Sequence, residues 1–491
     1  MILDIDLTNG DLNTNTGVFQ PTQVGSGNLN PVDSKKVISD IPKKKSNWPR
    51  ILLFALVGIA LGSIGYFVYE GSRISKELGF KFNIGEVVSI EKPELKKDTS
   101  GMYTNVLLVG VDSRESNYIS NTDTIIIGSY NHQTKDITMI SIPRDFYVIT
   151  NPQTKWVNRI NTVYAAAEIE NEGSGFPALI STVQEVTNLE IQYYAMVDFK
   201  AFVEIVDALG GLSINVENSF VDYEYPIGNK WKTVKFTAGP QIMDGETALE
   251  YSRSRHSLQN NEGSDYARAR RQQKVIVAIQ EKISQSDTFK DPKAIMGILS
   301  SLVNNIKVSE FTITDIQAGL NILEEIKNNN GRTNSFVLDP SAGDGTLIEV
   351  KTMSSGAFAI GPVEGFGKYK RIHEYVNAII TNPRIYSENP TIYIYDIGLG
   401  ATEIKKFVTE LRKEYPYLKV FISYPLYHGK EGNYIYSNED KYPETIKQLS
   451  RYVNTTNNSA PDFLEPKLSP TGVIMLLGVP TQLQQNNESG I

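Results

Sequence analysis

The sequence lacks cysteine altogether, since none of its 491 residues is of this type. This absence excludes structural disulfides, catalysis by a thiolate and any metal site with cysteine ligands. A surplus of basic residues is also missing, because 48 Lys and Arg stand against 56 Asp and Glu, a formal net charge of −8. Proteins that bind nucleic acid generally are basic, so this balance argues against nucleic acid as a partner.

Long apolar runs are scarce, and one of them has the length of a membrane span. Residues 51–69, ILLFALVGIALGSIGYFVY, carry no charge, and a helix of this length crosses about one bilayer. Lys43, Lys44, Lys45 and Arg50 precede the run, whereas charges of both signs follow it. The positive-inside rule therefore predicts a single-pass membrane protein with a cytoplasmic N-terminus and an extracellular remainder.

Two glycines within this run, Gly58 and Gly62, have the spacing of a helix-pairing motif. The spacing leaves open a homodimer through the membrane helix. Glycine is common in membrane helices, however, so the ordinary interpretation is favoured and no oligomeric state is predicted.

The chain as a whole has the ordinary composition of a globular protein, with 40% hydrophobic and 21% charged residues. Its apolar periodicity predicts alternating strands and helices, hence an α/β fold, and a Pro-containing stretch at 382–390 marks a boundary before a smaller α/β domain. We predict a disordered cytoplasmic tail (1–47), a transmembrane helix (48–70), an extracellular linker (71–103), a first α/β domain (104–285), its helical and strand extension (286–385), a small C-terminal α/β domain (386–480) and a disordered tail (481–491).

The stretch from Asn105 to Asp145 contains the first candidate site. Three short runs rich in Val and Ile, 106–111, 124–130 and 137–142, predict buried strands. Charged residues stand at the ends of these strands: Asp112, Arg114, Asp123, Arg144 and Asp145. A sheet holds such groups rigidly in reach of a ligand, so we predict a binding site at its edge.

Further arginines lie near predicted element ends or together on one helix: Arg253, Arg255, Arg268 and Arg271. Arg268 and Gln272 are four residues apart and therefore share a helix face. The guanidinium fork holds phosphate oxygens bidentately, whereas carboxylates together with phosphate oxygens suit Mg²⁺. With Asp112 and Asp123 as the carboxylates, the pattern predicts a site for Mg²⁺-bound pyrophosphate.

At these residues the sequence resembles the LytR-CpsA-Psr family of cell-wall ligases. The matching segments come in the family's order and spacing: LLVGVDSR (107–114), TDT (122–124), SIPRD (141–145), RIN (159–161), DFKAFVEIVDALGG (198–211), MDGETALEYSRSR (243–255) and DYARARRQQ (265–273). The C-terminal region resembles the small α/β domain often found after this module. The resemblance implies a membrane-anchored αβα sheet domain that faces the cell wall.

The resemblance also implies a reaction. A glycopolymer is transferred from a polyprenyl-pyrophosphate carrier to peptidoglycan as a phosphodiester, with Mg²⁺ as cofactor, and polyprenyl phosphate leaves. By resemblance, Asp112 and Asp123 hold the metal, and the catalytic residues are Arg144, Arg255 and Asp123. The phosphates are bound by Arg144, Arg253, Arg255, Arg268 and Gln272. The prenyl chain needs an apolar slot, for which the helices Phe199–Leu209 and Val275–Ile283 are the candidate walls.

The sequence departs from the family at Asn121, where the family usually has an arginine two residues before the second metal-site aspartate. Arg114 lies on the same loop and is the candidate to replace that charge, so we include it among the pyrophosphate ligands. Asp145 is interpreted as a structural partner of a neighbouring arginine, and Arg271 either as a solvated or weakly paired surface residue or as a member of a structural pair. The four histidines show no ligand spacing.

Two alternatives to the transferase remain open. A pyrophosphatase acting on the same lipid carriers would use the same site with water as the acceptor. A non-catalytic wall-binding or regulatory protein would keep the site as an anion pocket, although the presence of both carboxylates and the SIPRD arginine argues against it.

Overall fold

The computed structural model describes residues 93–112, 119–151, 153–228, 230–286, 305–310, 313–353, 358–423, 425–426, 429–464, 468 and 470–479. The predicted membrane helix, both predicted tails and Arg114 lie outside these residues. Within them, no helix combines the length and apolarity that a membrane span requires. All described residues belong to one compact unit, Gly65–Ile491.

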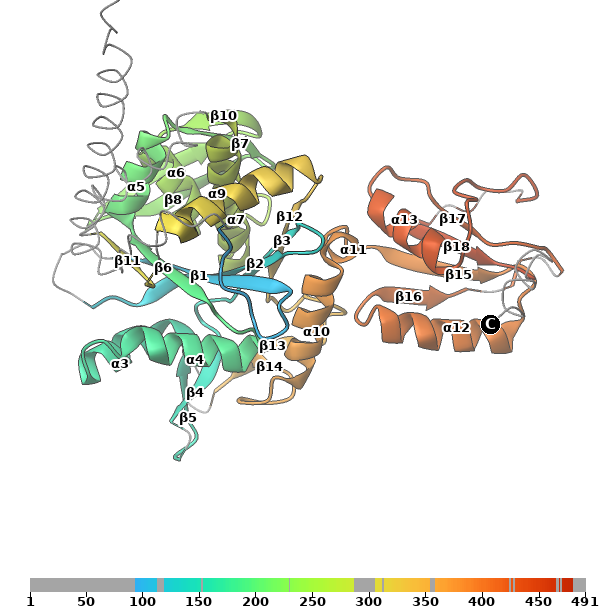
Figure 1. The fold of residues 1–491 in the computed structure, drawn as a ribbon, viewed down its shortest axis with the longest axis horizontal. Helices are drawn as coiled ribbons and strands as arrows, with labels where there is room; N and C mark the ends of the chain where they lie inside the picture. Colours follow the sequence, from blue (N-terminus) through green and yellow to red (C-terminus); the bar gives the residue numbers. More distant parts are fainter. Residues whose placement is uncertain are drawn as a thin grey trace, which may run out of the picture. The chain divides into compact units, whose positions relative to one another are not determined.

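A six-stranded sheet with the order β11-β6-β1-β2-β3-β12 forms the centre of the region that precedes the C-terminal sheet (Figure 1). Its strands are β1 (Tyr103–Val111), β2 (Thr122–Asn131), β3 (Ile137–Ser141), β6 (Tyr193–Asp198), β11 (Ile306–Val308) and β12 (Thr333–Val337). β1, β2 and β3 form an antiparallel meander, β6 runs parallel to β1, and β12 runs parallel to β3. Leu107, Ile127 and Ile140 are fully buried, so the three strands predicted from Val- and Ile-rich runs are confirmed.

Helices cover both faces of this sheet (Figure 1). One face carries α3 (Val163–Glu170), which follows the short 3₁₀ helix η1 (Ile160–Thr162), and also α4 (Gly175–Thr187) and α10 (Lys370–Thr381). The other face carries α5 (Phe199–Ala208), α6 (Gly245–Arg253), α7 (Asp265–Gln285) and α9 (Ile313–Asn328). Leu179 and Val183 of α4 join Leu107 of β1 in one apolar cluster, which holds that face to the sheet.

Local capping residues determine where helices α5 and α6 begin and where α5 ends. Asp198 accepts a hydrogen bond from the backbone N–H of Ala201 at the start of α5 (2.8 Å), and Asp244 caps α6 in the same way. α5 ends before Gly210 and Gly211, which adopt φ values of 74° and 82° that a continuing helix does not allow. These caps place the first turn of α5 directly after the end of β6.

Four two-stranded sheets accompany the central sheet: β4 (Tyr147–Asn151) with β5 (Trp156–Arg159), β7 (Leu212–Val216) with β10 (Gly239–Met243), β8 (Phe220–Ile227) with β9 (Lys230–Phe236), and β13 (Ile348–Thr352) with β14 (Phe358–Pro362). A second apolar cluster joins β7, β8 and β9 to α5, α6 and α7 through Leu212, Phe220 and Val275. The β8–β9 hairpin was not predicted, because the sequence KWKTVKF of β9 is mostly exposed and lacks a long alternating pattern.

The C-terminal region forms a four-stranded sheet with the order β16-β15-β18-β17. Its elements are β15 (Thr391–Asp396), α12 (Ala401–Glu414), β16 (Lys419–Ile422), β17 (Tyr434–Ser437), α13 (Pro443–Tyr452) and β18 (Val473–Leu477). β15 pairs in parallel with both neighbours, and every residue of β18 is buried. The stretch predicted as a boundary contains the short helix α11 (Pro383–Ser387).

Arg384 of α11 forms a buried ion pair. Its Nη2 and Nε atoms donate to the carboxylate of Asp136 over 2.8 and 3.0 Å, and the Asp136 side chain is only 3% exposed. The backbone N–H of Arg332 donates to the same carboxylate over 2.8 Å. The pair therefore ties α11 to the β2–β3 turn and to the start of β12.

Replacing Arg384 with alanine should lower the free energy of unfolding by about 3 kcal/mol, because Asp136 would stay buried without its cation. Urea unfolding followed by circular dichroism measures the change. Lys370→Ala is the control, since its exposed ammonium lies 4.0 Å from Glu374 and its loss should cost no more than about 0.5 kcal/mol. Equal unfolding midpoints for the two variants would contradict the prediction.

Candidate active site

The two predicted metal-binding carboxylates lie where β1 ends and β2 begins, on the side of the central sheet formed by these strand ends. Gly110 pairs with Thr124 and Val111 pairs with Thr122, so Asp123 is the extra residue of a β-bulge. A bulge redirects a side chain and is common beside active sites. Gly110 permits the close approach of the strands here, because a Cβ at this position would lie 2.9 Å from the Cβ of Thr124. Asp112 follows β1 directly, which places both carboxylates at the same edge.

Arg144 contacts three carboxylates. Its Nη1 donates to Asp123 Oδ2 over 3.3 Å, and its Nε lies 3.5 Å from Asp145 and 3.7 Å from Asp265. Asp265 also contacts Arg268, at 3.1 Å. Asp145 and Asp265 thus hold the guanidinium groups in place, as the sequence interpretation of Asp145 expected.

Arg253 is fixed by three further contacts. Its guanidinium lies over the ring of Phe199, 3.8 Å from the ring centroid. Nη1 donates to the hydroxyl of Tyr225 over 3.0 Å, and Nη2 donates to Asp112 over 3.4 Å. Arg253, at the end of α6, therefore contacts Asp112 at the end of β1.

Arg268 is the most buried of these arginines, with 7% of its surface exposed. Burial lowers its pKa, because the protein interior disfavours the charged form, and Asp265 opposes this effect. The positive charges of Arg144 and Arg255 lower the pKa further, whereas Asp123 raises it. Three arginines thus act on one another at one site, and a bound anion would relieve their repulsion.

Hydrogen bonds to a buried carboxylate, Asp222, hold the segment that carries Arg255. Asp222 of β8 is fully buried and accepts hydrogen bonds from Ser254 Oγ (2.6 Å) and from the backbone N–H groups of Arg255 (2.9 Å) and His256 (3.2 Å). Burial raises the pKa of Asp222, but these hydrogen bonds outweigh burial and hold the pKa below its ordinary value.

Arg271 holds the opposite side of this segment. Its Nε donates to the carbonyl oxygen of Tyr251 over 2.9 Å, its Nη2 donates to the carbonyl oxygen of Ser254, and its Nη1 contacts Glu262. Arg271 is therefore a buried structural residue, so the structural pair among the sequence alternatives is confirmed and the surface arginine is wrong.

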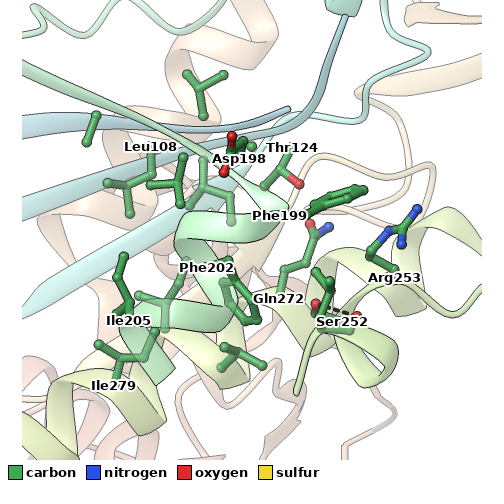
Figure 2. A pocket seen from close by; sticks show the side chains of 18 residues that line it. Leu108, Thr124, Asp198, Phe199, Phe202, Ile205, Ser252, Arg253, Gln272 and Ile279 are labelled. Carbon is green, nitrogen blue, oxygen red and sulfur yellow. Dashed lines mark hydrogen bonds between the residues drawn. The ribbon is translucent and has the colours of Figure 1, made fainter. Parts of the chain in front are cut away.

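A cavity of about 190 Å³ opens between the sheet, α5 and α7 (Figure 2). One end is polar and carries Asp198, Ser252, Arg253 and Gln272. The opposite end is apolar and carries Phe202 and Ile205 of α5 with Ile279 of α7, and Ile276 of α7 also lines the cavity. Both helices named as candidate slot walls line this one cavity, which has its arginine at the polar end.

The structure brings together Asp112, Asp123, Arg144, Arg253, Arg255, Arg268 and Gln272, every predicted site residue among those it describes. Arg114 lies outside the described residues, and Asn121 is exposed at the start of β2. Sequence reasoning gave no role to Asn161, Asp222 or His256. The RIN segment (159–161) could have identified Asn161 as a site residue, whereas no recognised motif contains Asp222.

The donor set fits Mg²⁺ bound jointly with phosphate. Among the described residues no group of three or more His, Asp and Glu side chains is arranged to hold an ion. Asn161 Nδ2 donates to Asp123 over 3.3 Å, and its buried Oδ1 has no hydrogen-bond partner. Two carboxylates and an amide oxygen are hard ligands that leave positions for phosphate oxygens and water, as Mg²⁺ requires.

An αβα protein with this site has the features of proteins that bind a ligand with an anionic head and an apolar tail, because Arg253 stands at the polar end of an otherwise apolar cavity. Residues 78–338 match the LytR_cpsA_psr family, and the chain belongs to that family.

Similar proteins include biofilm regulatory protein A of Streptococcus mutans, 30% identical over 295 residues that cover 56% of this chain and 66% of that protein. The polyisoprenyl-teichoic acid–peptidoglycan teichoic acid transferase TagU of Oceanobacillus iheyensis is 31% identical over 282 residues, which cover 54% of this chain and 78% of TagU. Among solved structures, protein gbs0355 from Streptococcus agalactiae has a TM-score of 0.44 and 24% identity, with 57% of this chain and 89% of that chain covered.

Proposed function

We propose that this protein is a transferase that moves a glycopolymer from a polyprenyl-pyrophosphate carrier to peptidoglycan as a phosphodiester. The observation that carries the proposal is the cavity with Arg253 and Gln272 at its polar end and apolar walls on α5 and α7. A prenyl chain suits the walls, and a pyrophosphate suits the arginines. The transferase name of the TagU relative supports the same reaction.

The chemistry is a phosphoryl transfer, in which positioning and charge neutralisation supply most of the catalysis. An acceptor hydroxyl attacks the phosphorus that carries the glycan, and the bond to the polyprenyl phosphate breaks. Arg144 and Arg268, both held by Asp265, stand where negative charge grows on the phosphates, while Arg253 is fixed against Phe199. Wall-linked glycan as the product distinguishes this reaction from hydrolysis, which releases free glycan.

Asp112 and Asp123 are proposed to hold Mg²⁺, with Asn161 as a further oxygen ligand. When bound, the ion supplies Lewis-acid neutralisation of the pyrophosphate charge. The bulge at Asp123 and the hydrogen bond from Asn161 hold the carboxylate in place.

The membrane placement is part of the proposal. The uncharged run 51–69 and the cationic residues before it support a single-pass anchor with the N-terminus in the cytoplasm and the site facing the wall. This placement brings the cavity to the side of the membrane where peptidoglycan lies.

The purified full-length protein should carry polyprenyl phosphate or pyrophosphate lipid, detectable by lipid extraction and mass spectrometry. Ile276→Arg places a cation on the apolar wall and should lower both bound lipid and transfer rate by at least about 10-fold, because burying a charge is costly. The matched control is Ile242→Arg, since Ile242 is exposed on β10 and lines no part of this cavity. Equal lipid content in the two variants would remove the cavity from the substrate site.

A further inference from the structure

His256 follows the arginine segment directly and has a partner that the sequence did not indicate. Its ring Nδ1 is buried, makes no hydrogen bond and lies 3.8 Å from Asp222 Oδ1. Within the described part of the chain, this imidazole is the basic side chain that lies within ion-pair distance of Asp222. The ring is itself partly exposed, with 29% of the side chain accessible.

Asp222 is suited to support a charge on that ring. It is fully buried, and its hydrogen bonds hold its pKa below the ordinary value, so it faces the imidazole as an anion shielded from water. A buried carboxylate behind Nδ1 orients a histidine and stabilises the imidazolium that forms when the other ring nitrogen takes a proton. A short rotation would close the 3.8 Å gap, and catalytic hydrogen bonds are often long before substrate binds.

The other acidic groups at the site already have guanidinium partners. Asp123 contacts Arg144, Asp112 contacts Arg253, and Asp265 contacts Arg268. These contacts serve to orient the phosphate-binding arginines. The reaction nevertheless needs a group that takes the proton of the acceptor hydroxyl, and imidazole is the side chain that exchanges a proton near neutral pH.

We propose that His256, supported by Asp222, is the general base that activates the acceptor hydroxyl; this role rests on the transferase function proposed above. The hydroxyl oxygen forms the new bond to phosphorus while its proton moves to Nε2 of His256. The bond between that phosphorus and the bridging oxygen breaks, and its electron pair leaves with the polyprenyl phosphate. The imidazolium then returns its proton to solvent.

The surroundings of His256 fit a sugar acceptor. Trp231 of β9 is 66% exposed, and its ring stands edge-on to the imidazole with 6.4 Å between centroids. A flat exposed indole beside the base offers a surface on which a sugar ring can lie. The charged group in contact with His256 is Asp222 on β8, and Arg255 precedes it on its own segment. Lys230 and Lys232 flank Trp231 on β9, so their side chains leave the opposite face of the strand, where Lys232 binds Glu250.

The test uses the full-length enzyme with a polyprenyl-pyrophosphate-linked glycan and a peptidoglycan acceptor. The wild-type kcat should fall as pH is lowered, because a protonated imidazole cannot accept the proton. His256→Gln should lower kcat by about 10²- to 10³-fold, abolish this acidic limb and change the KM of the donor by less than about twofold. His373→Gln is the matched control, since His373 contacts the Glu185 carbonyl and should behave as wild type.

Added imidazole should restore part of the activity of His256→Ala, a result that a purely structural role does not explain. The assignment is overturned if His256→Gln keeps the wild-type kcat, or if its loss falls on donor KM with the acidic limb intact. A failure of the proposed function looks different, because the wild type itself would then release free glycan and link none to the wall.

Discussion

Replacing Arg144 with lysine should lower the rate of glycopolymer transfer by about 10²- to 10³-fold, while the fold stays intact. Lysine keeps the charge but loses the planar fork that contacts Asp123 and is proposed to bind a phosphate at the same time. The Nε atom of Arg144 is buried without a hydrogen bond and lies between Asp145 and Asp265, and an ammonium cannot reproduce this geometry. Transfer kinetics with a defined lipid-pyrophosphate donor measure the loss.

The matched control for this substitution is Arg270→Lys. Arg270 lies on α7 near Arg268, but it is exposed and its guanidinium stands 4.0 Å from Asp339. Its replacement should leave transfer within about twofold of wild type, as expected for an exposed ion pair. If Arg144→Lys turned over as fast as Arg270→Lys, Arg144 would have no part in phosphate binding.

The secondary structure around the site was predictable because its signals are local. The Val- and Ile-rich runs of β1 to β3 became buried strands, and the Gly210-Gly211 pair that follows α5 is a local helix-stop signal. The pairing of Arg268 with Gln272 on one helix face also follows from spacing alone. The family resemblance added the roles of these residues, which spacing does not contain.

The support of the site was not predictable, because it depends on contacts between distant segments. Asp222 reaches the backbone of Arg255 and His256 from β8, which lies 33 and 34 residues earlier in the chain, and no local signal links the two segments. No local feature of His256 distinguishes it from the other histidines. The bulge that exposes Asp123 is likewise a property of strand register, which becomes visible only when β1 and β2 are paired.

Asp123→Asn should weaken Mg²⁺ activation by about 10-fold or more and lower the maximal rate by about 10²-fold, because it removes one negative charge from the proposed ion's ligands. The amide is nearly isosteric, so the bulge and the hydrogen bond from Asn161 can persist. Titration of the transfer rate against Mg²⁺ in metal-stripped enzyme measures both effects. EDTA should abolish wild-type transfer, and unchanged transfer in EDTA would remove the metal from the reaction.

Asp145→Asn is the control that separates metal binding from the orientation of Arg144. Asp145 contacts Arg144 and Arg159 but does not belong to the bulge, so its loss should lower the rate without shifting the Mg²⁺ dependence. Asp112→Asn should shift that dependence as Asp123→Asn does. If both carboxylates bind one ion, the double variant should lose less than the sum of the two single losses, because the ion is already lost after the first substitution. Fully additive losses would assign the two carboxylates to separate tasks, with Asp112 serving only to hold Arg253.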